Sequence, residues 1–168
     1  MGALALGTES PSESLLNRYP YRRDASLINN RMIRHIAVQS LYQISLIVYL
    51  LFYGATDFGV TIDSIEHNSL IFTTFVICQI VNEVNARSIT DTMNVFTNIF
   101  ENIFFISVLF VTIIVQYLLI ESPNVNWLIK VVSLPQGAWY KCTLLGMVSL
   151  PLGGLMRLIP VGVRVGEI

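Results

Sequence analysis

The sequence predicts an all-α membrane protein with four transmembrane helices and with both termini in the cytoplasm. Of its 168 residues, 54% are hydrophobic and only 12% are charged, whereas an ordinary soluble domain carries about 25% charged residues. A chain of this length cannot bury so much apolar surface within itself. Lipid or a protein partner must therefore cover it, and four long apolar stretches supply the helices.

The first 35 residues are predicted to be the end of a preceding helix followed by a basic cytoplasmic linker. The apolar residues 1–7 are too few for a signal peptide, and Leu6 stands where a myristoylation signal requires Ser or Thr. A polar segment containing Pro11 follows. Five arginines come next, at Arg18, Arg22, Arg23, Arg31 and Arg34.

The four apolar stretches form a predicted transmembrane domain at residues 36–161. They cover residues 36 to about 58, 70 to about 84, 103–120 and 131 to about 161. A helix crosses the hydrocarbon layer with about 20 mainly apolar residues, and the third stretch fits best because it holds no charge. The second is short, and the fourth is interrupted by prolines and glycines. A short cytoplasmic tail, residues 162–168, ends the chain.

Charged residues predict the orientation of these helices. Half of the basic residues precede the first stretch, whereas the loop after it carries Asp57, Asp63 and Glu66 and no Lys or Arg. Cytoplasmic loops collect Lys and Arg, so we expect the N-terminal linker inside and this loop outside. An even number of crossings then returns the C-terminus to the cytoplasm.

Three polar residues in the second stretch form a candidate ion-path or helix-packing face. Gln79, Asn82 and Glu83 share one side of a helix, and Asn85 lies off it. Polar groups at membrane depth are costly unless they are paired. The face should therefore turn toward other helices or an aqueous cavity, and both interpretations, interhelical hydrogen bonds and an ion pathway, stay open.

Two further patterns concern packing. Phe96, Phe100 and Phe104 recur every four residues around the loop 85–102, which suits core packing, a membrane surface or the docking of a cytoplasmic domain. In the fourth stretch, Ser149 and Gly153 form a small-xxx-small pair that lets helices approach closely. Pro151 between small residues predicts a bend, or alternatively a pore-lining break.

Several function classes are excluded. A net charge of −1 lacks the basic excess of a nucleic-acid-binding protein. The sequence contains no Gly-rich phosphate loop, no nucleophile triad and no metal-ligand spacing, and Cys78 and Cys142 give no disulfide framework. We expect no nucleic-acid partner, and no catalytic residue, metal ligand or cofactor held by this chain.

Motifs along nearly the whole chain match one known family. They comprise Leu4-Ala5-Leu6-Gly7-Thr8-Glu9, then Asn82-Glu83-x-Asn85-Ala86-Arg87 with Asn94-Val95-Phe96, and finally Trp139, Cys142, Gly146 and Gly153. On these motifs the chain resembles the C-terminal transmembrane region, helices seven to ten, of plasma-membrane-type (type IIB) P-type calcium-transporting ATPases.

The resemblance implies the C-terminal membrane domain of an ATP-driven calcium-exporting pump. The domain would brace the transport helices and dock the cytoplasmic ATPase domains through the loop residues Asn85, Arg87, Asn94, Phe96, Phe100 and Asn102. Calcium, magnesium and ATP are implied for the longer pump. The family's Asp-Lys-Thr-Gly phosphorylation motif does not occur here, so this chain alone should neither bind ATP nor pump.

The resemblance has finer implications. Gln79 aligns with a glutamate of two-ion relatives, and a neutral amide cannot replace that charge on a divalent cation, so the one-ion kind is expected. No C-terminal calmodulin site is visible before the chain ends at Ile168. The expected location is the plasma membrane or a vacuolar or other internal membrane, with lipid and the rest of the pump as partners.

Two other hypotheses belong to different classes. The first is a free-standing four-helix membrane protein that binds and regulates an intact pump. The second is a small oligomeric channel built around the Gln79 face.

Overall fold

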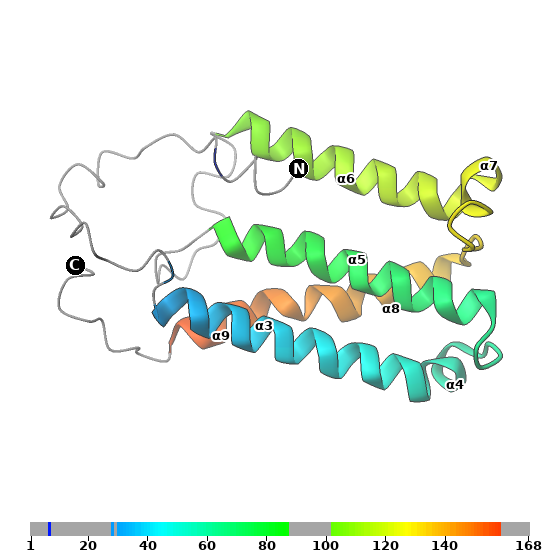
Figure 1. Ribbon diagram of the computed structural model, residues 1–168, viewed down its shortest axis with the longest axis horizontal. Helices are drawn as coiled ribbons and strands as arrows, with labels where there is room; N and C mark the ends of the chain where they lie inside the picture. Colours follow the sequence, from blue (N-terminus) through cyan, green and yellow to red (C-terminus); the bar gives the residue numbers. More distant parts are fainter. Residues whose placement is uncertain (1–6, 8–27, 29, 88–101, 159–168) are drawn as a thin grey trace, which may run out of the picture.

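The computed structural model describes Gly7, Ile28, residues 30–87 and residues 102–158. Within these residues the secondary structure is entirely helical, which confirms the predicted all-α class for this part of the chain. The long helices run side by side along the longest axis of the molecule (Figure 1). Short helices and turns close one end, which we call the α4/α7 end after the two short helices there.

The first long helix is built from three consecutive pieces. α3 (Asn30–Tyr49) continues into a π-helical turn, η1 (Leu50–Gly54), and then into α4 (Ala55–Phe58). Helix thus begins six residues before the predicted first stretch, so the expected linker boundary at residue 35 falls inside α3. Gly59 ends the helix in the left-handed region, with φ of 69°, a conformation that glycine adopts without steric cost.

The second long helix, α5 (Ile65–Arg87), lies at the centre of the fold. It contacts α3, α6, α8 and α9. Six of its ten buried residues follow one another at intervals of three or four positions, which is the spacing of one helix face: His67, Leu70, Thr74, Cys78, Val81 and Asn85. The helix begins earlier than the predicted residue 70 because Ser64 caps it: the Ser64 Oγ accepts the His67 N–H at 3.1 Å.

The third long helix, α6 (Ile103–Glu121), agrees with the predicted stretch 103–120. Asn102 caps its N-terminus, since the Asn102 Oδ1 accepts the Phe105 N–H at 3.0 Å. The short helix α7 (Pro123–Asn126) follows at the far end.

The predicted fourth stretch is two shorter helices rather than one continuous span. After non-helical residues 131–135, α8 (Gln136–Met147) and α9 (Ser149–Arg157) meet at Val148. Pro135 precedes α8 in an extended conformation, and Pro151 has no N–H to continue the hydrogen-bond series from α8 into α9. The interruption expected at Pro151 is therefore present, close to that residue.

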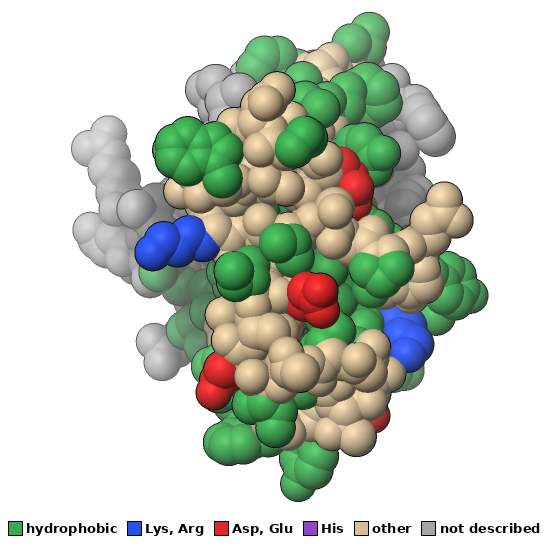
Figure 2. Space-filling view, turned by 90° about the vertical axis from the view of Figure 1, so that its right-hand side faces the viewer, with side chains coloured by type: hydrophobic (Ala, Val, Ile, Leu, Met, Phe, Trp, Pro, Cys, Tyr) green, Lys and Arg blue, Asp and Glu red, His purple; other side chains and the backbone are tan. Residues whose placement is uncertain are grey.

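Within the part of the chain that the structure describes, three helices are long and apolar enough, by length and composition, to cross a membrane: Asn30–Phe58, Ile65–Arg87 and Ile103–Glu121. α8 and α9, with 12 and 9 residues, fall short of that length individually. Many apolar side chains face outward, including Phe110 at 62% exposure and Leu41 at 68%. Figure 2 looks onto the α4/α7 end, where acidic and basic side chains reach the surface among hydrophobic ones. The chain is thus an integral membrane protein.

Two apolar clusters pack α5 against its neighbours near opposite ends. Val84 of α5 packs with Phe105 and Val108 of α6. Toward the α4/α7 end, Leu70 of α5 packs with Ile120 of α6 and Cys142 of α8. These clusters position the polar groups described next.

Candidate functional site: a polar junction of three helices

Gln39 of α3, Asn85 of α5 and Ser149 of α9 meet in a buried cluster that we call the polar junction. The Ser149 backbone carbonyl accepts hydrogen bonds from the Gln39 Nε2 at 3.3 Å and from the Asn85 Nδ2 at 3.0 Å. The Ser149 hydroxyl donates to the Gln39 Oε1 at 2.8 Å. All three residues are buried, Asn85 completely. One residue at the start of α9 therefore joins three helices.

Arg157 extends the polar junction at the end of α5. Its Nη2 donates to the backbone carbonyl of Asn85 at 3.2 Å. Asn85 lies in the last turn of α5. Carbonyls in the last turn receive no hydrogen bond from an N–H of the same helix, and a positive charge is favourable there. Arg157 is only 5% exposed, so it links the C-terminal turns of α5 and α9 inside the protein.

Two glycines allow the helices to come this close. A Cβ on Gly153 would lie 2.8 Å from the Asn85 Oδ1, and a Cβ on Gly146 would overlap the Ile77 Cγ2. Both contacts are too close for real side chains. The close approach expected from the Ser149–Gly153 pair is thus present, and its partner is Asn85 on α5.

The chemistry of the polar junction does not suit a divalent cation. Its side chains are two amides, a hydroxyl and a guanidinium, whereas Ca²⁺ and Mg²⁺ favour carboxylate oxygens. The Asn85 Oδ1 is buried and accepts no hydrogen bond from the groups that the structure describes. Across the described ranges, no three His, Cys, Asp or Glu residues gather into a possible metal site. The junction is suited to holding helices together.

The three residues of the predicted face on α5 lie in different surroundings. Gln79 is exposed, and its Nε2 donates to the Gln43 Oε1 of α3 at 3.2 Å. Asn82 and Glu83 are half-buried, and the Glu83 Oε1 is buried without a hydrogen-bond partner among the described groups. The interhelical hydrogen bond of Gln79 is of the kind that the packing interpretation requires, and the ion-path interpretation stays a prediction.

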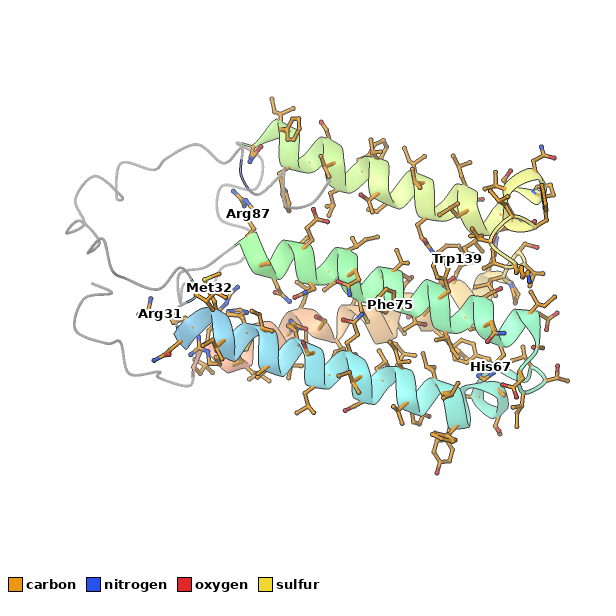
Figure 3. All side chains as sticks on the ribbon, viewed as in Figure 1. Arg31, Met32, His67, Phe75, Arg87 and Trp139 are labelled. Atoms are coloured by element: carbon orange, nitrogen blue, oxygen red, sulfur yellow. The ribbon has the colours of Figure 1, made fainter. Side chains whose placement is uncertain are left out.

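The predicted docking residues are described only in part. Asn85 belongs to the polar junction, and the Arg87 guanidinium lies over the Phe105 ring at 5.6 Å. Asn102 caps α6. Asn94, Phe96 and Phe100 lie outside the described residues, so docking stays a prediction. Figure 3 shows Arg87 and Arg31 on different helices at the end of the bundle opposite His67.

Sequence reasoning missed three members of the polar junction. Neither Gln39 nor Arg157 was singled out in the sequence, and Asn85 was assigned to the docking loop rather than to a contact between helices. The available signal was polarity at membrane depth, since a polar side chain there needs a partner. The identity of that partner was not in the pattern.

Comparison with known proteins agrees with the resemblance. Residues 1–159 match the protein family described as "Cation transporting ATPase, C-terminus". The chain belongs to this family. It is 39% identical over 164 residues to the "Putative calcium-transporting ATPase 13, plasma membrane-type" of Arabidopsis thaliana. The aligned segment covers 98% of this chain and 16% of the relative.

Two other members of the family show the same relationship. The "Calcium-transporting ATPase 12, plasma membrane-type" of Arabidopsis thaliana is 40% identical over 96% of this chain and 15% of its own length. The "Plasma membrane calcium-transporting ATPase 4" of Bos taurus is 36% identical over 94% of this chain and 14% of its own length. The chain therefore spans about one sixth to one seventh of the length of these relatives.

Proposed function

We propose that the chain is the C-terminal membrane domain of a P-type pump that exports calcium at the expense of ATP. Its helices brace the transport helices, and its cytoplasmic loop docks the ATPase domains. The family match over residues 1–159 carries this proposal, and the calcium-transporting names of the relatives indicate the ion. The longer pump would supply the sites for ATP, magnesium and calcium.

The polar junction supports the bracing role. Its hydrogen bonds join Asn85 to Ser149, which are 64 positions apart in the chain, and Gln39 to Ser149, which are 110 positions apart. A buried hydrogen bond between membrane helices contributes about 0.6–2 kcal/mol, so the three bonds make a rigid unit. A rigid unit beside moving helices gives them a fixed surface to work against.

The charge distribution supports cytoplasmic termini. Arg31, Arg34, Arg87 and Arg157 belong to one end of the described bundle, and Asp57, Asp63, Glu66 and Glu121 belong to the α4/α7 end. Basic residues concentrate on the cytoplasmic side. We propose that the α4/α7 end faces away from the cytoplasm.

We propose that α8 and α9 together form the fourth membrane crossing. Residues 136–157 rise about 1.5 Å each in a helix, which is enough for a hydrocarbon layer of about 30 Å. The two helices lie along α5, from the α4/α7 end to the polar junction (Figure 1). Just after the interruption, the Ser149 carbonyl accepts hydrogen bonds from Gln39 and Asn85.

A chimeric pump tests the proposal. In the Arabidopsis calcium-transporting ATPase 12, the matching C-terminal segment is replaced by this chain, and ATP-dependent uptake of radioactive calcium into inside-out vesicles is measured. We expect uptake by the chimera, none by the relative truncated before the segment, and none by this chain alone. Asn85→Leu should lower the amount of folded chimera, whereas Asn124→Leu, a matched change on the exposed α7, should not.

Two results would contradict the proposal. One is ATP-driven calcium uptake by residues 1–168 without another polypeptide. The other is an immunoblot of the native source, with an antibody against residues 88–101, that shows only a band near 18.9 kDa. That band would favour the free-standing regulator. The docking role is tested in the chimera by Phe96→Ala and Phe100→Ala, which should reduce uptake per molecule of folded protein.

A further inference from the structure

We propose that residues 127–130, which we call the Trp127 turn, insert into the headgroup layer of the bilayer at the α4/α7 end. The partner is a lipid surface. The proposal goes beyond the proposed function and does not depend on it, since the Trp127 turn would contact lipid in a pump subunit and in a free-standing protein alike.

The Trp127 turn presents apolar side chains outward. Trp127 is 69% exposed, Leu128 is 67% exposed and Ile129 is 38% exposed. Three consecutive large apolar residues on a surface are unfavourable in water, at about 25 cal/mol per Å² of apolar area. Such a patch is therefore typical of a surface that lipid or a partner covers.

The Trp127 turn is held in this position by structure on both sides. Before it, Ile120 at the end of α6 is completely buried. After it, Val131 is buried, and the Val132 N–H donates to the Ser69 Oγ of α5 at 2.9 Å. The Trp127 indole itself donates from Nε1 to the Asn124 carbonyl at 2.9 Å. Its only polar atom is thus paired within the protein, and its ring remains to contact an apolar phase.

The distribution of tyrosine and tryptophan places a membrane interface at this level. Among the described residues, every exposed Tyr or Trp lies in the half of its helix or turn that is nearer the α4/α7 end: Tyr49, Tyr53, Tyr117, Trp127 and Tyr140. Of the exposed phenylalanines, which have no polar atom, Phe104, Phe110 and Phe75 occur elsewhere along the helices, and Phe52 directly precedes Tyr53. Amphipathic rings collect at the headgroup layer because one part is apolar and the other wet.

The length of α6 agrees with a membrane interface at the α4/α7 end. Its 19 residues extend about 28 Å at 1.5 Å per residue, which is close to the thickness of the hydrocarbon layer. The end of α6 at Glu121 therefore falls at the boundary, and the Trp127 turn follows within a few residues. Lys130 is exposed at the end of this turn, where its flexible side chain can reach lipid phosphates.

The chain contains only two tryptophans, Trp127 and Trp139, so fluorescence can test the proposal. The full chain with Trp139→Phe, which leaves Trp127 as the sole tryptophan, is reconstituted into phosphatidylcholine vesicles. The vesicles carry a nitroxide quencher on the acyl chain, either near the headgroup or near the chain end. Aqueous iodide quenching is measured in parallel.

We expect the shallow nitroxide to quench Trp127 more strongly than the deep one, and iodide to quench it weakly. Trp127→Phe is the matched control. It reports Trp139, which is half-buried with its Nε1 donating to the Glu121 Oε1 at 2.8 Å, and we expect less quenching by lipid. The wild-type signal minus that of Trp127→Phe gives the Trp127 response even if Trp139→Phe folds poorly.

Three results would overturn the proposal. Strong iodide quenching without lipid quenching would place the Trp127 turn in water. Stronger quenching by the deep nitroxide would place it in the hydrocarbon core. A lack of quenching by all three agents would show that protein, such as a second copy of the chain, covers the Trp127 turn.

Discussion

Asn85 makes three of the contacts that hold the polar junction together. Its side-chain amide donates to the Ser149 carbonyl, its own carbonyl accepts from Arg157, and its carboxamide fills the space beside Gly153. A larger residue at position 153 has no room because Asn85 is fully buried and held on both sides. The close contact therefore depends on a glycine at one position and an amide at the other.

Gly153→Ala should destabilise the protein. The new Cβ would lie 2.8–2.9 Å from three atoms of the Asn85 carboxamide, so either the hydrogen bond to Ser149 or the spacing of α5 and α9 must change. Overpacking of this kind costs about 1–3 kcal/mol. The measurement is the free energy of unfolding of the purified protein, titrated with SDS in mixed detergent micelles.

Gly154→Ala is the matched control for this prediction. A Cβ on Gly154 meets no atom within 4 Å, and alanine is a better helix former than glycine by about 1 kcal/mol. We expect unchanged or increased stability. Equal losses from the two substitutions would show that the contact with Asn85 is unimportant.

The π-helical turn η1 is stabilised from another helix. A π-turn places an extra residue in the helix without a matching hydrogen bond, and the buried Leu50 carbonyl at its start is paired with the His67 Nε2 of α5 at 2.8 Å. The His67 Nδ1 accepts the Asp63 N–H at 3.3 Å, which assigns the ring proton to Nε2. One histidine therefore joins η1, the turn before α5 and α5 itself.

His67→Phe should weaken the α4/α7 end. The substitution keeps an aromatic ring but leaves the Leu50 carbonyl unpaired, and Leu50 is only 1% exposed. An unsatisfied buried carbonyl costs about 1–3 kcal/mol. We expect a loss of this size in the free energy of unfolding, together with faster amide hydrogen exchange in residues 50–58.

Asn68→Ala serves as the control for His67→Phe, because Asn68 is the exposed neighbour of His67 on α5. It should leave both measurements nearly unchanged. Wild-type stability and exchange in His67→Phe would mean that the ring packs against η1 without a significant hydrogen bond.

The bundle as a whole has two chemically different ends. The ends of α3, α5 and α9 that carry arginine lie together, and four of the five acidic residues that the structure describes, Asp57, Asp63, Glu66 and Glu121, belong to the α4/α7 end (Figure 1). Two lysines also belong to the α4/α7 end: Lys130 is exposed, and the Lys141 Nζ donates to the Asp57 carbonyl at 2.8 Å and lies over the Phe58 ring. This polarity predicts one orientation in the membrane.

Cysteine labelling should reveal that orientation. Asn124→Cys on α7 and Ala86→Cys in the last turn of α5 are both exposed positions, and the native Cys78 and Cys142 are buried. In sealed vesicles with the cytoplasmic face inside, an impermeant maleimide should label the cysteine at 124 directly. It should label the cysteine at 86 only after permeabilisation.

The reverse labelling pattern would overturn the proposed cytoplasmic termini. The protein without either introduced cysteine provides the background, and it should stay unlabelled while the helices remain folded.

The amino-acid sequence alone was sufficient to predict that this protein lies in a membrane and that its fold is all-α. The scarcity of charge predicted a membrane, apolar runs predicted the helices near residues 36–58, 70–84 and 103–120, and short motifs indicated the family. These properties are local, because the hydrocarbon layer acts on each segment separately. Local chemistry also gave part of the packing, since a small residue at 153 predicted a close helix contact.

The partners were decided by the tertiary structure. Periodicity shows which face of a helix is buried, but many other helices could cover that face. Gln39 and Ser149, 110 residues apart, and His67 and the Leu50 carbonyl, 17 apart, meet only because α5 packs against several helices at once. The tertiary structure likewise decides what meets the start of α9: the Ser149 carbonyl and hydroxyl pair with Gln39 and Asn85 because α3 and α5 both pack against α9.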